Sequence, residues 1–277
     1  MALTPFQRGL CRTLAYSRAA SSAAEESYVA GGAALNQTLD APRLSRDVDL
    51  FHDTLEALDA TWNSDRALLQ QAGYSVETIR ERPGFVEAEV WREQDGLHQS
   101  VLVQWVRDSA FRFFPLLPHP DFGLTLHPLD LATNKVLALV GRVEVRDWVD
   151  ALTCHHKVAP LGLLAWAACG KDEGWNPQLI LDEASRNARA SREELEEIEW
   201  EGEPPNFAFM KQEWREALAT ARDTIRLLPP EEIGKAVLES DGGLFRGSNN
   251  ALARELEAGH LRFHEGHIGG AWPQLKL

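Results

Sequence analysis

The residues best suited to chemistry are Asp47 and Asp49, which flank a single valine. On a strand, side chains two residues apart project from the same face, so the two carboxylates would lie together. Like charges at this spacing repel each other unless a cation neutralises them. Carboxylate oxygens are ligands that suit Mg²⁺ and also Mn²⁺. We therefore predict that Asp47 and Asp49 bind a divalent metal, Mg²⁺ or Mn²⁺.

A glycine pair, Gly31 and Gly32, precedes the two aspartates, with Asp47 fifteen residues after Gly32. Because glycine has no Cβ, its backbone N–H groups can approach a phosphate closely at the start of a helix. Ser45 and Arg46 stand immediately before Asp47. We predict that Gly31, Gly32 and Ser45 cradle phosphate and that Arg46 assists them, so that phosphate and metal meet at one site.

Several elements are needed to position these residues. A short buried strand at 27–31 leads into a helix at 33–39, and a strand at 45–51 is followed by a helix over about 54–72. Further strands are expected near 75–80, 85–91 and 99–107, because Pro83-Gly84 and Asp95-Gly96 mark turns between apolar stretches. These elements predict a mixed sheet flanked by helices.

The second half of the chain has a different pattern. A proline-rich segment at 115–128 separates the predicted strands from helical periodicity that runs from 129 to about 228. The final stretch from 240 has weak periodicity and is interpreted as a docked tail. We therefore predict an α+β protein with a helical C-terminal lobe and a domain boundary near residue 120.

Composition excludes several classes of protein. The chain has 277 residues and a net charge of −14, so as a whole it repels nucleic acids unless a local basic patch exists. No apolar run approaches the roughly 18 residues of a membrane span, which excludes a membrane protein. The three cysteines fit neither a disulfide framework nor a paired zinc motif, which favours a reducing compartment such as the cytoplasm. Phe6, Leu10 and Leu14 predict an amphipathic N-terminal helix rather than a targeting segment.

Two blocks of sequence resemble a known family. The segments 28–35 (YVAGGAAL) and 43–50 (RLSRDVDL) are similar to nucleotidyltransferases of the AbiEii/AbiGii toxin group, within the DNA polymerase β superfamily. The segments 131–139 (LATNKVLAL) and 142–150 (RVEVRDWVD) are similar to the lysine helix of that group and its Arg-Asp-x-x-Asp helix. The resemblance covers about 26–157. It implies that residues 1–120 form a nucleotidyltransferase core with an N-terminal helix, and that 121–277 form the helical lobe and C-terminal tail.

The resemblance also assigns roles to two residues of the second block. Lys135 is expected to contact the triphosphate or the catalytic carboxylates, and Asp147 to close the cleft from the helical lobe. Arg142, Arg146 and Asp150 follow at four-residue steps and would share one helical face. Read without the family, Lys135 would be an exposed helical lysine, and the charged residues around Asp147 would be an ordinary helix-stabilising network.

Gln104 departs from the wider superfamily, in which many members place a third acid at this strand position. A neutral amide cannot act as a general base. Either Asp147 supplies the missing charge, or catalysis is weak or lost. A non-catalytic nucleotide-binding protein with the same fold is therefore the alternative to an enzyme.

The predicted reaction is metal-dependent transfer of a nucleotidyl group from a nucleoside triphosphate to an acceptor hydroxyl, with pyrophosphate leaving. The resemblance implies tRNA as one acceptor and a toxin restrained by an antitoxin protein, whereas a small-molecule or protein acceptor stays equally open. A more distant alternative is a metal hydrolase using His260, His264 and His267, whose helical spacings favour a surface helix instead.

Overall fold

The computed structural model describes residues 3–18, 27–94, 96–187 and 190–274. The chain forms two compact units. Unit 1 comprises Met1–Ala110 and Leu116–His127, and unit 2 comprises Phe111–Pro115 and Pro128–Leu277. The domain boundary that the sequence predicts near residue 120 stays a prediction.

Unit 1 is built on a seven-stranded sheet with the strand order β3-β4-β5-β2-β1-β8-β7. Its elements are α1 (Pro5–Arg18), β1 (Ser27–Ala30), α2 (Gly31–Thr38), β2 (Asp47–His52), α3 (Leu55–Gln71), β3 (Ser75–Arg82), β4 (Phe85–Gln94), β5 (Leu97–Arg107), β7 (Leu117–His119) and β8 (Gly123–Thr125). Strand β2 is antiparallel to β1 and parallel to β5, so the sheet is mixed. The predicted α+β class with a helix-flanked mixed sheet is confirmed.

Strands β7 and β8 lie in the proline-rich segment where the sequence predicted none. Strand β8 runs parallel to β1, with Val29 opposite Thr125. The Thr125 hydroxyl also donates a 2.8 Å hydrogen bond to the carbonyl of Val29. Contacts with a strand almost a hundred residues earlier therefore fix this segment, and local sequence carries little sign of them.

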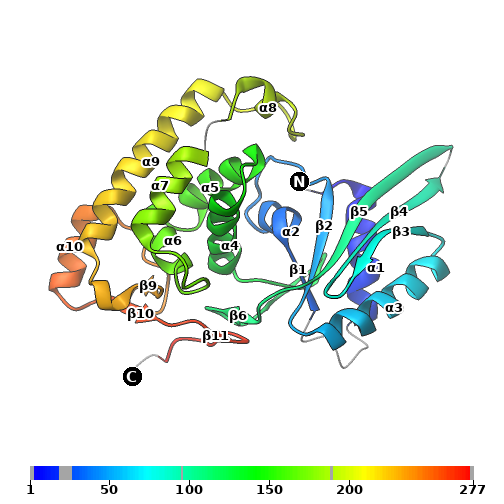
Figure 1. The fold of residues 1–277 in the computed structure, drawn as a ribbon, viewed down its shortest axis with the longest axis horizontal. Coiled ribbons are helices and arrows are strands. Elements are labelled where there is room, and N and C mark those ends of the chain that lie inside the picture. Colours follow the sequence, from blue (N-terminus) through cyan, green and yellow to red (C-terminus); the bar gives the residue numbers. More distant parts are fainter. Residues whose placement is uncertain (1–2, 19–26, 95, 188–189, 275–277) are drawn as a thin grey trace. The chain divides into compact units, whose positions relative to one another are not determined.

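Helices α1 and α3 pack on one face of the sheet (Figure 1). Alternate residues of the central strands are buried there, among them Val103 and Trp105 on β5. The Trp105 ring packs edge to face against Trp62 of α3, with 4.7 Å between the ring centroids, and its indole N–H donates to Asp65 Oδ2 at 2.9 Å. The Thr54 hydroxyl caps α3 by accepting a hydrogen bond from Ala57 N. This packing leaves the opposite side chains of β2, β4 and β5 on a second, half-buried face.

Unit 2 is mainly helical, as the periodicity from 129 to 228 predicted. Its elements are β6 (Phe111–Arg112), α4 (Pro128–Gly141), α5 (Val145–Lys157), α6 (Leu161–Ala168), α7 (Pro177–Asn187), α8 (Arg192–Glu196), α9 (Phe207–Leu227), a 3-10 helix (Pro230–Glu232), β9 (Ala236–Leu238), α10 (Asn249–Glu257), β10 (Arg262–His264) and β11 (His267–Ile268). Among the described residues, no helix is long and apolar enough to span a bilayer.

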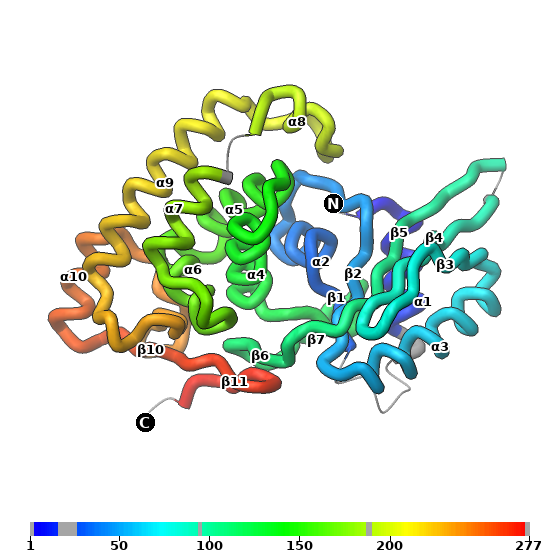
Figure 2. The backbone as a smooth tube through the Cα atoms, viewed as in Figure 1, coloured from blue at the N-terminus to red at the C-terminus, as the bar shows by residue number. Residues whose placement is uncertain are grey.

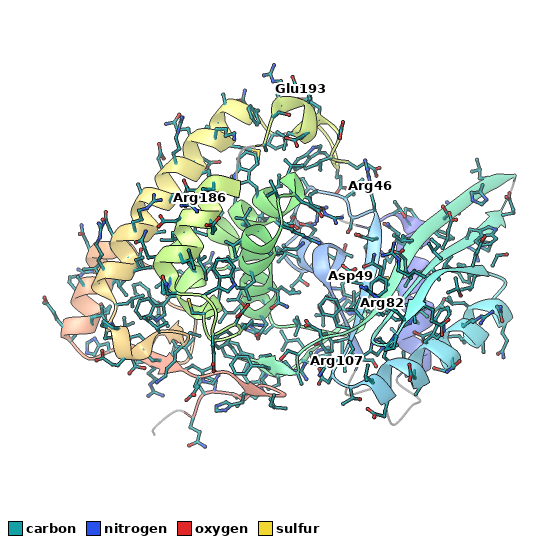
Figure 3. All side chains as sticks on the ribbon, in the orientation of Figure 1. Arg46, Asp49, Arg82, Arg107, Arg186 and Glu193 are labelled. Carbon is teal, nitrogen blue, oxygen red and sulfur yellow. The ribbon has the colours of Figure 1, made fainter. Side chains whose placement is uncertain are left out.

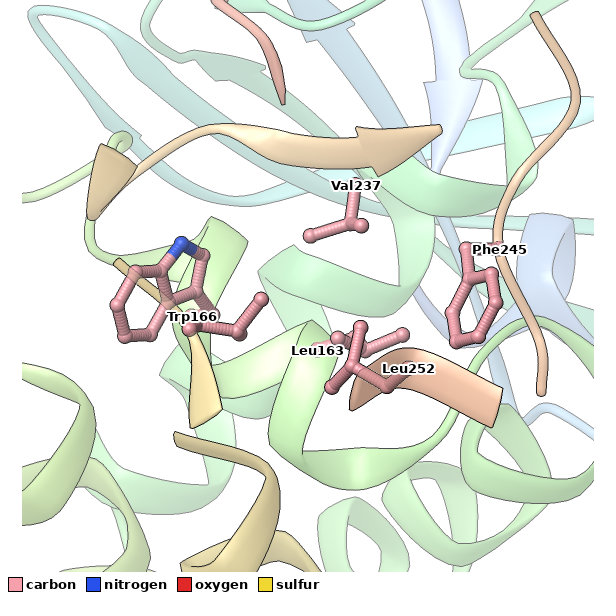
Figure 4. Packing of buried hydrophobic residues seen from close by; sticks show 6 residues of the cluster. Leu163, Trp166, Val237, Phe245 and Leu252 are labelled. Atoms are coloured by element: carbon pink, nitrogen blue, oxygen red, sulfur yellow. The ribbon is translucent and has the colours of Figure 1, made fainter. Parts of the chain in front are cut away.

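The C-terminal segment contributes to the core of unit 2. Trp166 of α6, Val237 of β9 and Leu252 of α10 pack in one cluster with Leu163, Leu228 and Phe245 (Figure 4). The Trp166 indole N–H also donates to the Glu232 carbonyl at 2.8 Å, which ties α6 to the segment before β9. The described residues after 228 therefore fold as part of unit 2.

The expected surface helix over the three C-terminal histidines is wrong. Helix α10 ends before Gly259, which has a φ of +68°, a conformation that glycine adopts readily. His264 then lies on β10, which pairs with β9, and His267 lies on β11, which pairs with β6 (Figure 2). Strand pairing with distant segments replaces the helix, and His264 Nε2 donates to the Phe113 carbonyl at 2.8 Å.

Candidate active site

Asp47 and Asp49 lie on β2, the strand next to β5 in the sheet. Val48, Leu50 and His52 are buried, whereas Asp47 and Asp49, which alternate with them, are only half-buried. Both carboxylates therefore project from the same face, as the alternation predicted. Figure 3 labels Asp49 on this strand. The Ser45 hydroxyl, just before the strand, donates to Asp47 Oδ1 at 3.1 Å.

Gly31 lies directly against the Asp49 carboxylate. Ala30 and Asp49 are partners across β1 and β2, and Gly31 follows with a φ of +65°. A Cβ at Gly31 would stand 1.8 Å from Asp49 Oδ2, a distance that two such atoms cannot share. The carboxylate therefore occupies the space that any other residue type would fill at this position.

Gly32 also has neighbouring side chains packed closely against its backbone. A Cβ there would lie 2.5 Å from an Arg43 guanidinium nitrogen and 3.2 Å from the Ser45 hydroxyl. The turn thus brings Gly31, Gly32 and Ser45 together within unit 1, next to the aspartate pair. The fourth predicted phosphate contact, Arg46, is exposed just before β2.

Arg43 belongs to this group although the sequence did not single it out. It is only 5% exposed, and its guanidinium lies over Gly32. One guanidinium nitrogen donates to the Leu44 carbonyl at 3.1 Å. A buried guanidinium beside a glycine turn suits phosphate, which it can bind with several N–H groups. The available signal was its position two residues before Ser45.

These residues fit a divalent metal with phosphate. The donors are two carboxylates and a nearby hydroxyl, all hard oxygens of the kind that Mg²⁺ accepts. In the part of the chain that the structure describes, no group of three or more His, Cys, Asp or Glu side chains could hold a metal. A pair of carboxylates suits Mg²⁺, which commonly takes one or two from the protein and completes its shell with water and phosphates.

Gly31→Ala should separate the steric role of this glycine from its backbone role. Because of the left-handed φ, we expect a stability loss of about 1–2 kcal/mol, together with displacement of Asp49. Since a misplacement of about 1 Å can cost about a hundredfold in rate, we expect that loss in the nucleotidyl transfer that the sequence predicts. Gly73→Ala is the matched control, because Gly73 has a φ of +82° and nothing within 4 Å of its added Cβ. Equal transfer by the two variants would contradict the assigned clash; thermal unfolding and initial rates are the measurements.

Gln104 occupies the β5 position opposite Asp49. Its side-chain nitrogen donates to Glu87 Oε1 at 2.9 Å, and Glu87 is its partner on β4. Both side chains are half-buried on the face that carries the aspartates. Glu87 has no signal in the sequence, because only the strand register places this glutamate opposite Gln104.

In unit 2, Lys135 of α4 lies between two carboxylates of α5. Its ammonium nitrogen is 3.3 Å from Asp147 Oδ1 and 2.9 Å from Asp150 Oδ2. The lysine side chain is 9% exposed, and both aspartates are fully buried. The alternative of an exposed helical lysine is therefore wrong, whereas the charged network around Asp147 is present.

The arginines of this region differ from the prediction of one shared helical face. The chain leaves the helix after Gly141, so Arg142 precedes α5, which begins at Val145. Glu144, with extended backbone, is the N-cap that separates them. Arg142 Nε donates to Asp147 Oδ2 at 2.7 Å, while Arg146 pairs with Glu144 at 2.6 Å.

Burial moves the pKa values of Cys154 and His155 away from neutral pH. Burial raises the pKa of the Cys154 thiol far above its ordinary value, and the nearby Asp150 charge raises it further. Burial also lowers the pKa of His155 to about 4, with a contribution from His156, so its imidazole is neutral. His155 Nδ1 accepts a hydrogen bond from Leu161 N at 3.0 Å, which ties the C-terminal end of α5 to the start of α6.

A family model described as nucleotidyl transferase AbiEii toxin, type IV toxin–antitoxin system, matches residues 12–224. The chain belongs to the AbiEii family. Membership confirms the family that the sequence motifs indicated and makes the chain a nucleotidyltransferase of a toxin family. The matched range contains both aspartates of β2 and Lys135, and it ends before α10.

Two solved structures share the fold. MenT4, a nucleotidyltransferase toxin from Mycobacterium tuberculosis H37Rv, is 16% identical, with a TM-score of 0.52, over 82% of this chain and 85% of that one. JHP933 from Helicobacter pylori is 13% identical, with a TM-score of 0.51, over 81% of this chain and 95% of that one. A search of curated proteins found no match. At these identities the two structures support the fold that the AbiEii family implies.

Proposed function

We propose that this AbiEii-family protein transfers a nucleotidyl group from a nucleoside triphosphate to an acceptor hydroxyl, with Mg²⁺ or Mn²⁺ bound by Asp47 and Asp49. The observation that carries the proposal is the packing of the Asp49 carboxylate against Gly31, with Asp47 on the same face of β2. In this arrangement two hard-oxygen donors lie beside a glycine turn at the start of a helix.

Each residue of this group has a proposed role. When bound, the metal would polarise the reacting phosphate and lower the pKa of the acceptor hydroxyl. Gly31 and Gly32 present backbone N–H groups at the start of α2, where the helix dipole favours an anion. Ser45 and the guanidinium of Arg43 border the same turn, and Arg46 is the exposed cation nearest to β2 in sequence.

The catalytic roles proposed for Lys135 and Asp147 rest on the resemblance of 131–150 to the AbiEii family. An ammonium group would offset negative charge that develops on phosphate, and a carboxylate would supply the acid that Gln104 does not. Within unit 2 the same two residues also form a buried ion pair. A role in stability therefore accompanies any role in catalysis.

For the acceptor we propose tRNA, and for the partner an antitoxin protein, in the cytoplasm. The family description, a type IV toxin–antitoxin system, supports a toxin with an antitoxin. The net charge of −14 opposes long-range attraction of RNA, so recognition would require local cations. The three free cysteines, all buried, are compatible with a reducing compartment.

A label-transfer assay tests the proposal. The purified chain is incubated with each α-³²P-labelled nucleoside triphosphate, with and without tRNA, in Mg²⁺ or in EDTA. We expect metal-dependent label on tRNA for at least one nucleotide. Metal-dependent label on another molecule would retain the transfer reaction and reject tRNA as the acceptor. Absence of transfer, together with triphosphate binding by calorimetry, would favour the alternative of a nucleotide-binding protein without catalysis.

A further inference from the structure

One row of polar residues crosses three neighbouring strands of unit 1. Asp49 on β2 is opposite Gln104 on β5, and Gln104 is opposite Glu87 on β4. Directly opposed residues in a sheet share a face, so the three side chains lie on the same side. Strands lie about 4.8 Å apart, which puts the Cα atoms of Glu87 and Asp49 roughly 10 Å from each other.

The hydrogen bond between Gln104 and Glu87 fixes the direction of the amide. An ionised carboxylate can only accept, so the atom at 2.9 Å from Glu87 Oε1 must be the amide nitrogen of Gln104. The amide oxygen is bonded to the same planar carbon as the nitrogen, so it points in a different direction from the bond to Glu87. Since β5 stands between β4 and β2, the strand on the other side of Gln104 is the one that carries Asp49.

The adjacent row lacks this arrangement. There Asp47 is opposite Leu102, and Leu102 is opposite Glu89, so an apolar side chain separates the two acids. Glu89 and Glu87 share a strand, a face and half-buried positions. Of these two rows, only the row of Glu87 therefore has a polar side chain at each of its three positions, and Glu89 offers a matched comparison.

We propose that Glu87 is a positioning residue of the metal site. It holds the Gln104 amide so that the amide oxygen faces the coordination sphere at Asp49 as a neutral donor, and it adds a negative charge one strand further out. Glu87 thereby compensates for the acid that is absent at Gln104. This inference rests on the proposed function, because it requires metal at Asp47 and Asp49.

Binding of Mn²⁺ to the full-length protein without nucleotide tests the role of Glu87. The electron paramagnetic resonance signal of free Mn²⁺ gives the dissociation constant. Loss of a residue that orients a metal ligand typically weakens metal binding by about tenfold or more, and we expect a rise of about tenfold in Kd for Glu87→Gln. We expect a change of less than about twofold for Glu89→Gln, because Leu102 breaks that row. Gln104→Ala removes the amide and should raise Kd as Glu87→Gln does.

The exchange variant Glu87→Gln/Gln104→Glu provides a rescue. It retains one amide and one carboxylate in the row and moves the charge next to Asp49, so Mn²⁺ affinity should return to the wild-type value or exceed it. A hydrogen bond that only stabilised the sheet would alter the unfolding temperature of these variants without changing the Kd for Mn²⁺.

Asp49→Asn separates failure of this inference from failure of the proposed function. If Asp49→Asn weakens Mn²⁺ binding while Glu87→Gln and Gln104→Ala bind as wild type, the role of Glu87 is overturned and the metal site stands. If Asp49→Asn binds Mn²⁺ as wild type does, the proposed metal site is overturned and the role of Glu87 falls with it.

Discussion

Asparagine at position 49 is expected to lower kcat/KM for nucleotidyl transfer by about a thousandfold or more. A metal acting as a Lewis acid contributes several kcal/mol to a transition state, and each 1.36 kcal/mol is about tenfold in rate. Asparagine keeps the shape of Asp49 against Gly31 but removes the charge that would hold the metal. Because the substitution also removes repulsion from Asp47, we expect stability to be unchanged or slightly higher.

Initial rates of label transfer and thermal unfolding, measured on the same preparation, check this pair of effects. Asp59→Asn is the control, since Asp59 is an exposed aspartate on α3 of the same unit. Wild-type turnover by Asp49→Asn would contradict the assignment of Asp49 as a metal ligand. A large loss of stability would instead show that the carboxylate is structural.

Methionine at position 135 is expected to lower the free energy of unfolding by about 3–5 kcal/mol, the usual cost of removing one partner from a buried ion pair. Lys135 lies between Asp147 and Asp150, both fully buried, so its loss takes away the ammonium group 2.9 Å from Asp150. Arg142 still pairs with Asp147, which concentrates the damage at Asp150.

Urea unfolding of Lys135→Met measures this effect, with Lys157→Met, an exposed lysine on α5, as the control. Adding Asp150→Asn to Lys135→Met should recover part of the loss, because the buried charge is then gone. If Lys135→Met were as stable as wild type, the ion pair would have no structural importance. Any loss of activity in that variant could then be attributed to chemistry alone.

Local patterns were sufficient to predict the aspartate pair and its surroundings. Alternating burial on β2 follows directly from the residue types at 47–52, and the turn between β3 and β4 follows from Pro83-Gly84. Asp95 of the second predicted turn lies outside the described residues. The glycine pair was identifiable because only residues without Cβ tolerate the close approach of Asp49 and Arg43. Each of these features is visible in residue types that are close together in the sequence.

Features that depend on long-range pairing were not predictable. Strands β7 and β8 exist through pairing that starts at β1, and β10 and β11 exist through pairing with β9 and β6. Glu87 is in the row of Asp49 because of the registers of two strand pairs, although the two residues are far apart in sequence. Arg142 was assigned to the following helix because a four-residue step continues the pattern across a break in the backbone.

The hydrogen bonds and the ion pair of Asp130 have a consequence for recombination within the gene. Asp130 accepts hydrogen bonds from Phe113 N and Phe114 N and pairs with Lys171, so it anchors a short stretch of 111–115 within unit 2. The polypeptide then returns to unit 1 for 116–127. No single breakpoint in the gene can therefore separate the two units. A break after residue 127 keeps unit 1 complete but carries 111–115 of unit 2 with it, and a break after residue 110 keeps unit 2 complete but carries 116–127 of unit 1 with it.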